Sequence, residues 1–116
     1  MKRERPLPPR PELLRTPVRR FGWLDDRLLR EDWLARLGPE PTAAMVLLAL
    51  AADRHGASFY RRDTMARALS MPRSELDRSL ERLLELELVD HRPWTPLSPD
   101  GVWQLLPVPP SAPQPR

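Results

Sequence analysis

The sequence predicts one small α+β domain, mainly helical with a short β-hairpin, and two observations predict it. From residue 24 to residue 85, apolar side chains return every three or four positions, which is the spacing of amphipathic helices. Residues 88–94 and 102–106 then have the pattern of two short strands, and the loop between them ends in an Asp-Gly turn, which indicates a hairpin. With 116 residues, the chain has room for one such domain plus tails.

Proline marks the two ends of this domain. Five of the sixteen prolines lie in residues 1–22 and eight lie in residues 93–116. Such sequence cannot form a continuous helix and favours extended or polyproline-like chain. We therefore expect a basic extended arm over residues 1–22, the folded domain over residues 23–106, and a disordered tail over residues 107–116.

The first half of the domain is predicted to hold two helices and a strand. Residues 24–37 form an amphipathic pattern whose apolar stripe includes Leu29, and a Gly-Pro pair ends it. Residues 40–54 are apolar nearly all round, which is typical of a buried central helix. Residues 57–60 (ASFY) are short and aromatic, as in a strand.

Residues 61–89 have the pattern of two short amphipathic helices separated by a tight turn and followed by a strand. The first apolar stripe ends at Leu69, Met71 and Pro72 interrupt it, and a stripe in a new phase begins at Leu76. Pro72 suits the first turn of a helix, where its missing N–H is not needed. This is the pattern of a helix-turn-helix. The side chains that we expect to be buried in the domain are Trp33, Leu37, Met45, Leu47, Leu48, Leu50, Phe59, Met65, Leu69, Leu76, Leu80, Leu83, Leu88, Val89, Trp103 and Leu105.

Residues 52–89, ADRHGASFYRRDTMARALSMPRSELDRSLERLLELELV, resemble the winged helix-turn-helix domains of plasmid and phage replication initiators and of many small bacterial regulators. The similarity extends over about residues 40–106. It implies a winged helix whose second motif helix is a recognition helix and whose hairpin is the wing. It is specific for this fold and does not imply a particular target site.

Three residues depart from the pattern of that family. Ser70 stands where the family usually has glycine in the turn, and Pro72 stands where it usually has a capping serine or threonine. Glu87 stands where it usually has the glycine that ends the recognition helix. Because glycine supplies a positive φ at such positions, either the turn is built differently or the consensus is followed loosely.

The helix expected over residues 72–86 is the best candidate to read DNA. The N-terminal half of a recognition helix enters the major groove, where arginine can bind guanine through two hydrogen bonds. Arg73 and Arg78 on its outward face are the best candidates for base or phosphate contacts. The full set of candidate DNA-binding residues is Arg61, Arg62, Arg67, Arg73, Ser74, Arg78, Arg82 and Arg92, the last of these on the wing.

Acidic residues interleave with these arginines. Residues 61–82 hold six basic and four acidic side chains, a net charge of only +2. Pairs such as Arg73 with Asp77, or Arg78 with Glu81, would neutralise the surface. Groove reading by Arg73 and Arg78 and a charged face turned to solvent or to a protein partner are therefore both open.

The N-terminal arm carries the excess positive charge. Residues 1–22 have seven basic and two acidic side chains, whereas residues 23–115 have a net charge of −3. A flexible basic arm can follow a DNA backbone or enter a minor groove, and a solubilising tail is the alternative. The basic residues of the arm are Lys2, Arg3, Arg5, Arg10, Arg15, Arg19 and Arg20.

Three of the four tryptophans have two interpretations each. Trp103 is expected on the core, and Trp94 either covers an edge of the hairpin or is exposed for stacking on a partner. Trp23 and Trp33 either join the core or form a self-association patch in the N-terminal helical region.

Several classes of function find little support in the sequence. There is no cysteine, which fits a reducing compartment, and the two histidines, His55 and His91, lack metal-site spacing. Glycine-rich phosphate loops and nucleophile elbows are missing, so we expect no enzyme activity, no metal and no cofactor. The longest apolar run, residues 43–52, is short of the ~20 residues of a membrane span, and no secretion signal is recognisable. We expect a cytoplasmic protein, associated with the nucleoid if it binds DNA.

The leading hypothesis is a small bacterial protein that binds double-stranded DNA. It would act in transcription regulation, or as an accessory factor in DNA replication or in a mobile-element system. The alternative is an adaptor that binds another protein and does not recognise a DNA sequence. A binder of single strands through the arm is a third, weaker class, because no exposed aromatic platform is evident. A second copy, contacted through the N-terminal helix, is a further expected partner.

Overall fold

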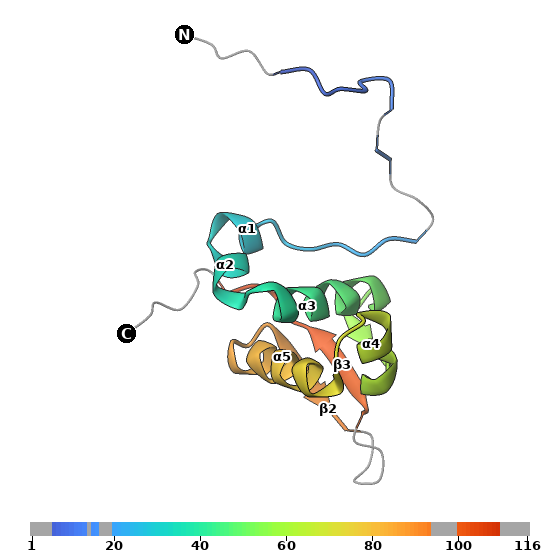
Figure 1. The fold of residues 1–116 in the computed structure, drawn as a ribbon, viewed down its shortest axis with the longest axis vertical. Coiled ribbons are helices and arrows are strands. Elements are labelled where there is room, and N and C mark those ends of the chain that lie inside the picture. The colour runs from blue at the N-terminus through green and yellow to red at the C-terminus, as the bar shows by residue number, and fades with distance from the viewer. Residues whose placement is uncertain (1–5, 14, 17–19, 94–99, 110–116) are drawn as a thin grey trace.

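The computed structural model describes residues 6–13, 15–16, 20–93 and 100–109 (Figure 1). Within them the chain forms five helices and a three-stranded antiparallel sheet, which confirms the α+β class. In chain order the elements are α1 (Arg27–Arg30), α2 (Trp33–Leu37), α3 (Pro39–Ala51), β1 (Ala57–Ser58), α4 (Arg62–Ala68), α5 (Arg73–Glu85), β2 (Val89–Arg92) and β3 (Val102–Leu105). No helix of this described part is both long and apolar enough to cross a membrane.

The sheet has β3 in its centre. The strand order is β1-β3-β2, and both pairs are antiparallel. The expected hairpin of β2 and β3 is confirmed, and its register places Trp103 opposite His91 on one side and opposite Ser58 on the other. The strand expected over residues 57–60 is shorter than predicted, because only Ala57 and Ser58 pair with β3.

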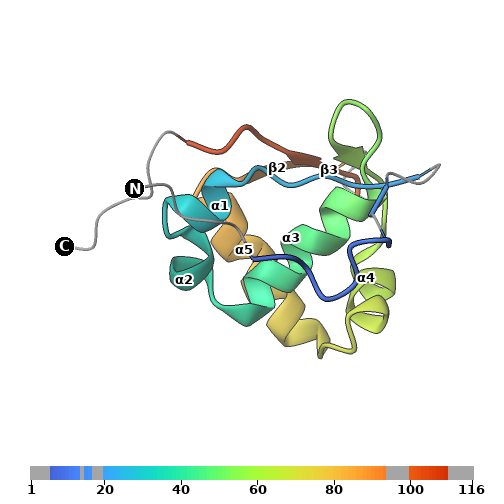
Figure 2. The same cartoon turned by 90° about the horizontal axis from the view of Figure 1, so that it is seen from above.

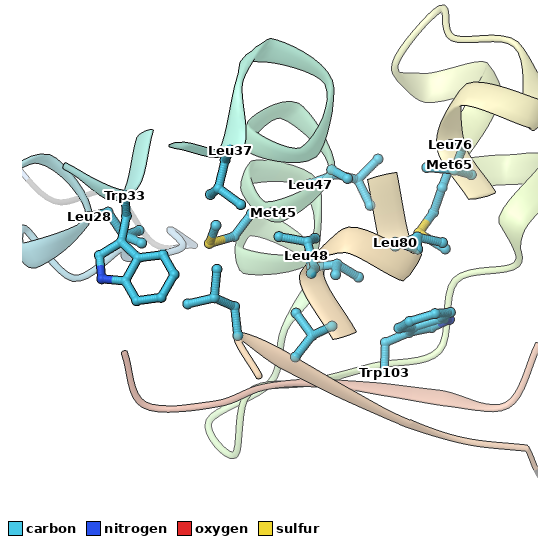
Figure 3. Packing of buried hydrophobic residues seen from close by; sticks show 14 of the residues in the cluster. Leu28, Trp33, Leu37, Met45, Leu47, Leu48, Met65, Leu76, Leu80 and Trp103 are labelled. Carbon is cyan, nitrogen blue, oxygen red and sulfur yellow. The ribbon is translucent and has the colours of Figure 1, made fainter. Parts of the chain in front are cut away.

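The core lies between the helices and the sheet. Helices α3 and α5 pack against each other, and the hairpin lies behind them (Figures 1 and 2). Figure 3 shows Trp33 at one end of the core and Trp103 at the other, with Met45 and Leu48 of α3 between them. Most of the expected core is buried, and Leu69 and Leu105 are half-buried.

Two residues of the expected core are exposed. Leu50 of α3 is 69% exposed, because no described element covers the outer face of the last turn of this helix. Phe59 is 56% exposed, because it follows the two-residue strand β1 and has left the sheet. The prediction that α3 is buried all round is therefore wrong on one side. The helix also ends at Ala51, three residues earlier than expected.

The helix expected over residues 24–37 is two short helices. Asp32 between them has φ 63°, a left-handed conformation that aspartate tolerates better than most residues. Leu28 and Trp33 are both buried, although they are five positions apart and a straight helix would point them in different directions. The break at Asp32 turns both toward the core, and Leu29 is left 68% exposed.

Two residues that stand where the family usually has glycine keep the left-handed backbone conformation that glycine favours. Ser70 has φ 51° and Glu87 has φ 58°. After α4, the N–H of Met71 donates to the carbonyl of Ala66 at 2.9 Å; after α5, the N–H of Leu88 donates to the carbonyl of Leu83 at 3.0 Å. Both ends are Schellman motifs, so the interpretation that the turn is built differently is wrong. Each left-handed residue other than glycine costs roughly 1–2 kcal/mol.

Candidate nucleic-acid interface

The candidate site is the polar surface of α4, the turn after it, and α5. Helix α5 begins immediately after Pro72, whose carbonyl accepts the N–H of Leu76 at 3.0 Å. Its apolar stripe, including Leu76 and Leu80, is buried against the rest of the domain. The opposite face exposes Ser74 and Arg78, which are four residues apart and so lie on the same side of the helix.

Arg73, a predicted base reader, is held by two carboxylates. Its Nη1 lies 2.5 Å from Asp63 of α4, and its Nε lies 3.1 Å from Asp77 of α5. The hydrogen bond with Asp77, and after it the one with Asp63, raises the pKa of the Arg73 guanidinium. Arg73 therefore ties the start of α5 to α4 instead of presenting a free cation.

Asp77 holds a second arginine as well. Nη1 of Arg62, the first residue of α4, lies 3.1 Å from the same Asp77 oxygen that Arg73 contacts. Burial raises the pKa of Asp77, but the hydrogen bonds from Arg73 and Arg62 outweigh it, so the pKa lies below its usual value. One carboxylate thus partly neutralises two of the predicted DNA contacts.

Arg62 also joins α4 to the hairpin. Its backbone N–H donates to a carboxylate oxygen of Asp100 at 3.1 Å, which supplies an acceptor at the first turn of α4. Its guanidinium lies 5.2 Å from the centre of the Trp103 ring, at cation–π distance. His91 stacks on the same ring with centroids 4.1 Å apart, and its Nε2–H donates to the carbonyl of Asp100 at 2.6 Å. The hairpin and α4 are therefore fixed to each other.

Four of the predicted arginines have side chains that make no ion pair or hydrogen bond within the described part of the chain. All four are exposed: Arg61, Arg67, Arg78 and Arg92. They lie just before α4, near its end, on α5 and at the end of β2. The predicted pair of Arg78 with Glu81 does not form, whereas the predicted pair of Arg73 with Asp77 does.

Acidic residues still surround the free cation of α5. Arg78 lines a shallow surface hollow together with Glu40, Glu75 and Ser79. The last predicted contact, Arg82, is half-buried, and its Nη1 is 3.7 Å from Glu85. The sequence-predicted site thus divides into arginines that the protein uses internally and arginines that it leaves to solvent.

The structure describes part of the arm and three of the four tryptophans. Arg10 pairs with Glu12 at 3.1 Å, and Arg15 and Arg20 are exposed. Trp103 and Trp33 are fully buried, as the core interpretation predicts, and Trp23 is 75% exposed. Four of the basic residues of the arm and one tryptophan lie outside the described residues: Lys2, Arg3, Arg5, Arg19 and Trp94.

Sequence reasoning missed two of the residues that organise this site. Asp63 lies ten residues before Arg73, and Asp100 lies 38 residues after Arg62, so no local spacing connects either pair. A signal did exist for the stack of His91 on Trp103, because the predicted hairpin makes the two residues neighbours.

Among the described residues no group of three or more histidine, aspartate or glutamate side chains is placed to hold a metal ion. Comparisons with protein-family models, with curated proteins and with solved structures find no match to this chain. The function is therefore inferred from the geometry and charge of the site.

Proposed function

We propose that this chain is a small DNA-binding protein of the winged-helix type. In this proposal α5 enters the major groove, the β2–β3 hairpin acts as the wing, and α4 lies on the phosphate backbone. Its role would be transcription regulation, or that of an accessory factor in replication or in a mobile-element system. The free arginines of α4, α5 and β2 are the single observation that carries the proposal, because an unpaired guanidinium can bind phosphate or guanine without first breaking an internal bond.

The geometry changes which arginine we expect to matter most. Arg73 would have to leave Asp63 and Asp77 before it could contact a base, and that exchange offsets much of the gain. Arg78 has no such bond in the described structure. We therefore assign base or backbone contact on α5 to Arg78, and we assign Arg73 and Arg62 to holding α4, α5 and the hairpin in place.

A salt titration of duplex binding tests this function. Wild-type protein should bind a random-sequence duplex with an affinity that falls linearly on logarithmic axes as salt rises, with a slope of about −0.9 for each phosphate contacted. Arg78→Gln should weaken binding, and it should flatten the slope by about one unit if Arg78 contacts a phosphate. Binding that is absent at low salt, or that does not depend on salt, would contradict the proposal.

A protein adaptor is the second candidate function. It is favoured by one observation: the carboxylates of Asp63 and Asp77 neutralise two of the arginines that a DNA-binding surface would use. Such an adaptor would show no affinity for duplex DNA in the titration above, so the same measurement separates the two functions.

A further inference from the structure

An apolar face beside the last turns of α3 has no cover in the described structure. Gly22 lies directly on this helix: a Cβ on it would come within 2.4 Å of the carbonyl oxygen of Ala49 and 3.0 Å of the Cα of Leu50. The stretch around Gly22 therefore passes the last turn of α3, as Figure 2 shows. Phe21 and Trp23, on either side of Gly22, are 65% and 75% exposed.

The exposed apolar side chains of this face form what we call the aromatic patch. Val46 and Leu50 are four residues apart on α3 and are exposed on the same side of it. The aromatic patch consists of Phe21, Trp23, Leu24, Val46 and Leu50. A helix that is apolar all round is normally covered all round, so the exposed side of α3 indicates a missing cover.

A hollow adjoins the aromatic patch. Its volume is about 690 Å³, and Phe21, Trp23 and Leu24 form part of its wall. Met45 and Ala49 of α3, together with Val108 after β3, supply other apolar parts of the wall. The volume lies within the range of roughly 300–1,000 Å³ of pockets that bury a ligand, so it accepts an indole side chain. The same face thus offers a projecting tryptophan and a place to receive one.

The charges at the rim of the hollow favour a partner without a strong net charge there. Arg27 pairs with Asp25 at 2.7 Å, and Asp53 accepts the backbone N–H groups of His55 and Ala57. Because these groups are largely satisfied within the chain, a strongly acidic or strongly basic partner would gain little from them. A second copy related by a two-fold axis presents the same balanced rim, so the apolar faces can meet without net repulsion.

The apolar area is sufficient for such a pair. With roughly 150–250 Å² for each aromatic side chain, the aromatic patch exposes on the order of 500 Å². This is at the upper end of the largest apolar patch of a typical monomer, about 300–600 Å². Two copies would together cover about 1,000 Å², near the lower limit of a specific interface.

We propose that the aromatic patch is a homodimer interface in which Trp23 of each copy enters the hollow beside α3 of the other. The arrangement is two-fold symmetric, with the same residues on both sides. It does not depend on DNA binding, since α5 and the free arginines of the candidate site are not part of the patch.

Sedimentation equilibrium of the full chain from micromolar to submillimolar concentration tests the proposal. Wild-type protein should reach twice the mass of one chain. Trp23→Ser should raise the dimer dissociation constant at least about 30-fold, as expected for an interface hot spot of 2 kcal/mol or more. Leu50→Ser should also weaken the dimer, because Leu50 lies within the patch.

The matched control is Leu29→Ser. Leu29 is an exposed leucine on α1, 68% exposed and outside the patch, so its substitution should leave the dimer constant unchanged. Circular dichroism should show that all three variants fold, because each replaces an exposed side chain. A wild-type chain that stays monomeric at submillimolar concentration would overturn the proposal, as would a dimer that both patch variants retain.

Discussion

Two surfaces of the molecule differ in how many of their side chains find partners within the chain. One is the polar surface of α4 and α5, and the other is the aromatic patch beside α3. On the polar surface, two of the arginines are bound to Asp63 and Asp77, so the charge visible in the sequence is larger than the charge offered to a partner. On the aromatic patch, Leu50, which the sequence predicts to be buried, is exposed, so the apolar surface is larger than expected. The groups that a fold leaves without partners, rather than its composition, define what each surface can bind.

The largest change in the free energy of unfolding is expected at one of two leucines that lie on opposite sides of α3. Leu48 is 1% exposed and Leu50 is 69% exposed. Leu48→Ala should lower the free energy of unfolding by about 2–5 kcal/mol, because it leaves a cavity in the core. Leu50→Ala should change it by no more than about 0.5 kcal/mol in protein dilute enough for the proposed dimer to dissociate. Urea denaturation of both variants measures the difference, and equal losses would mean that α3 is covered on both sides.

The next largest change in stability is expected at the turns that follow α4 and α5. Ser70→Gly and Glu87→Gly should each stabilise the fold by roughly 0.5–1 kcal/mol, because each removes the cost of a left-handed residue that has a side chain. Glu81→Gly is the control: Glu81 is exposed and lies in the interior of α5, so glycine there should destabilise by about 1 kcal/mol. Thermal unfolding that shows a loss of stability in the first two variants would contradict the Schellman geometry at these turns.

A smaller effect is expected when the internal neutralisation of the polar surface is removed. Asp77→Asn should release Arg62 from its ion pair and should leave Arg73 bound to Asp63 alone. If one of them gains a phosphate contact, the loss of duplex affinity between 50 and 200 mM salt should grow about threefold. Glu81→Gln serves as the control, because it removes an exposed acidic side chain of the same helix that pairs with no arginine in the described structure. Fluorescence anisotropy at the two salt concentrations checks this, and an unchanged salt slope for Asp77→Asn would show that neither arginine reaches DNA.

The pH dependence of stability gives the smallest expected effect. The pKa of Asp77 lies below its usual value in the folded chain. A carboxylate of this kind contributes stability above its unfolded pKa, near 3.9, and loses that contribution as pH falls through the lower folded value. The difference in unfolding free energy between wild type and Asp77→Asn should therefore be present at pH 6 and should shrink at pH 3. A constant difference would mean that Asp77 acts through packing and not through its charge.

Periodicity in the sequence predicted the elements that form α3, α4, α5 and the hairpin, because each has an apolar stripe bounded by proline, glycine or a turn. It did not predict the break at Asp32, which depends on Leu28 and Trp33 both reaching the core. It also could not show that Leu50 is exposed, since a continuous apolar pattern does not reveal which side of a helix other elements cover.

The candidate site was predicted in its residue types and only partly in its pairing. The pair of Arg73 with Asp77 follows from their spacing of four residues on a helix. The contacts of Arg73 with Asp63, and of Arg62 with Asp100, depend on how α4, α5 and the hairpin pack. Local spacing therefore could not distinguish the arginines that stay free from those that the fold uses.

Duplex binding by Arg78→Gln and Arg73→Gln, measured side by side at one low salt concentration, shows whether the free or the paired arginine of α5 contacts DNA. Both variants remove one arginine from the same helix, but only Arg73 is bound to carboxylates in the described structure. We expect that Arg78→Gln weakens binding at least about tenfold, or roughly 1.4 kcal/mol, and that Arg73→Gln weakens it clearly less. Equal affinity of Arg78→Gln and wild type, or a larger loss for Arg73→Gln, would contradict this expectation.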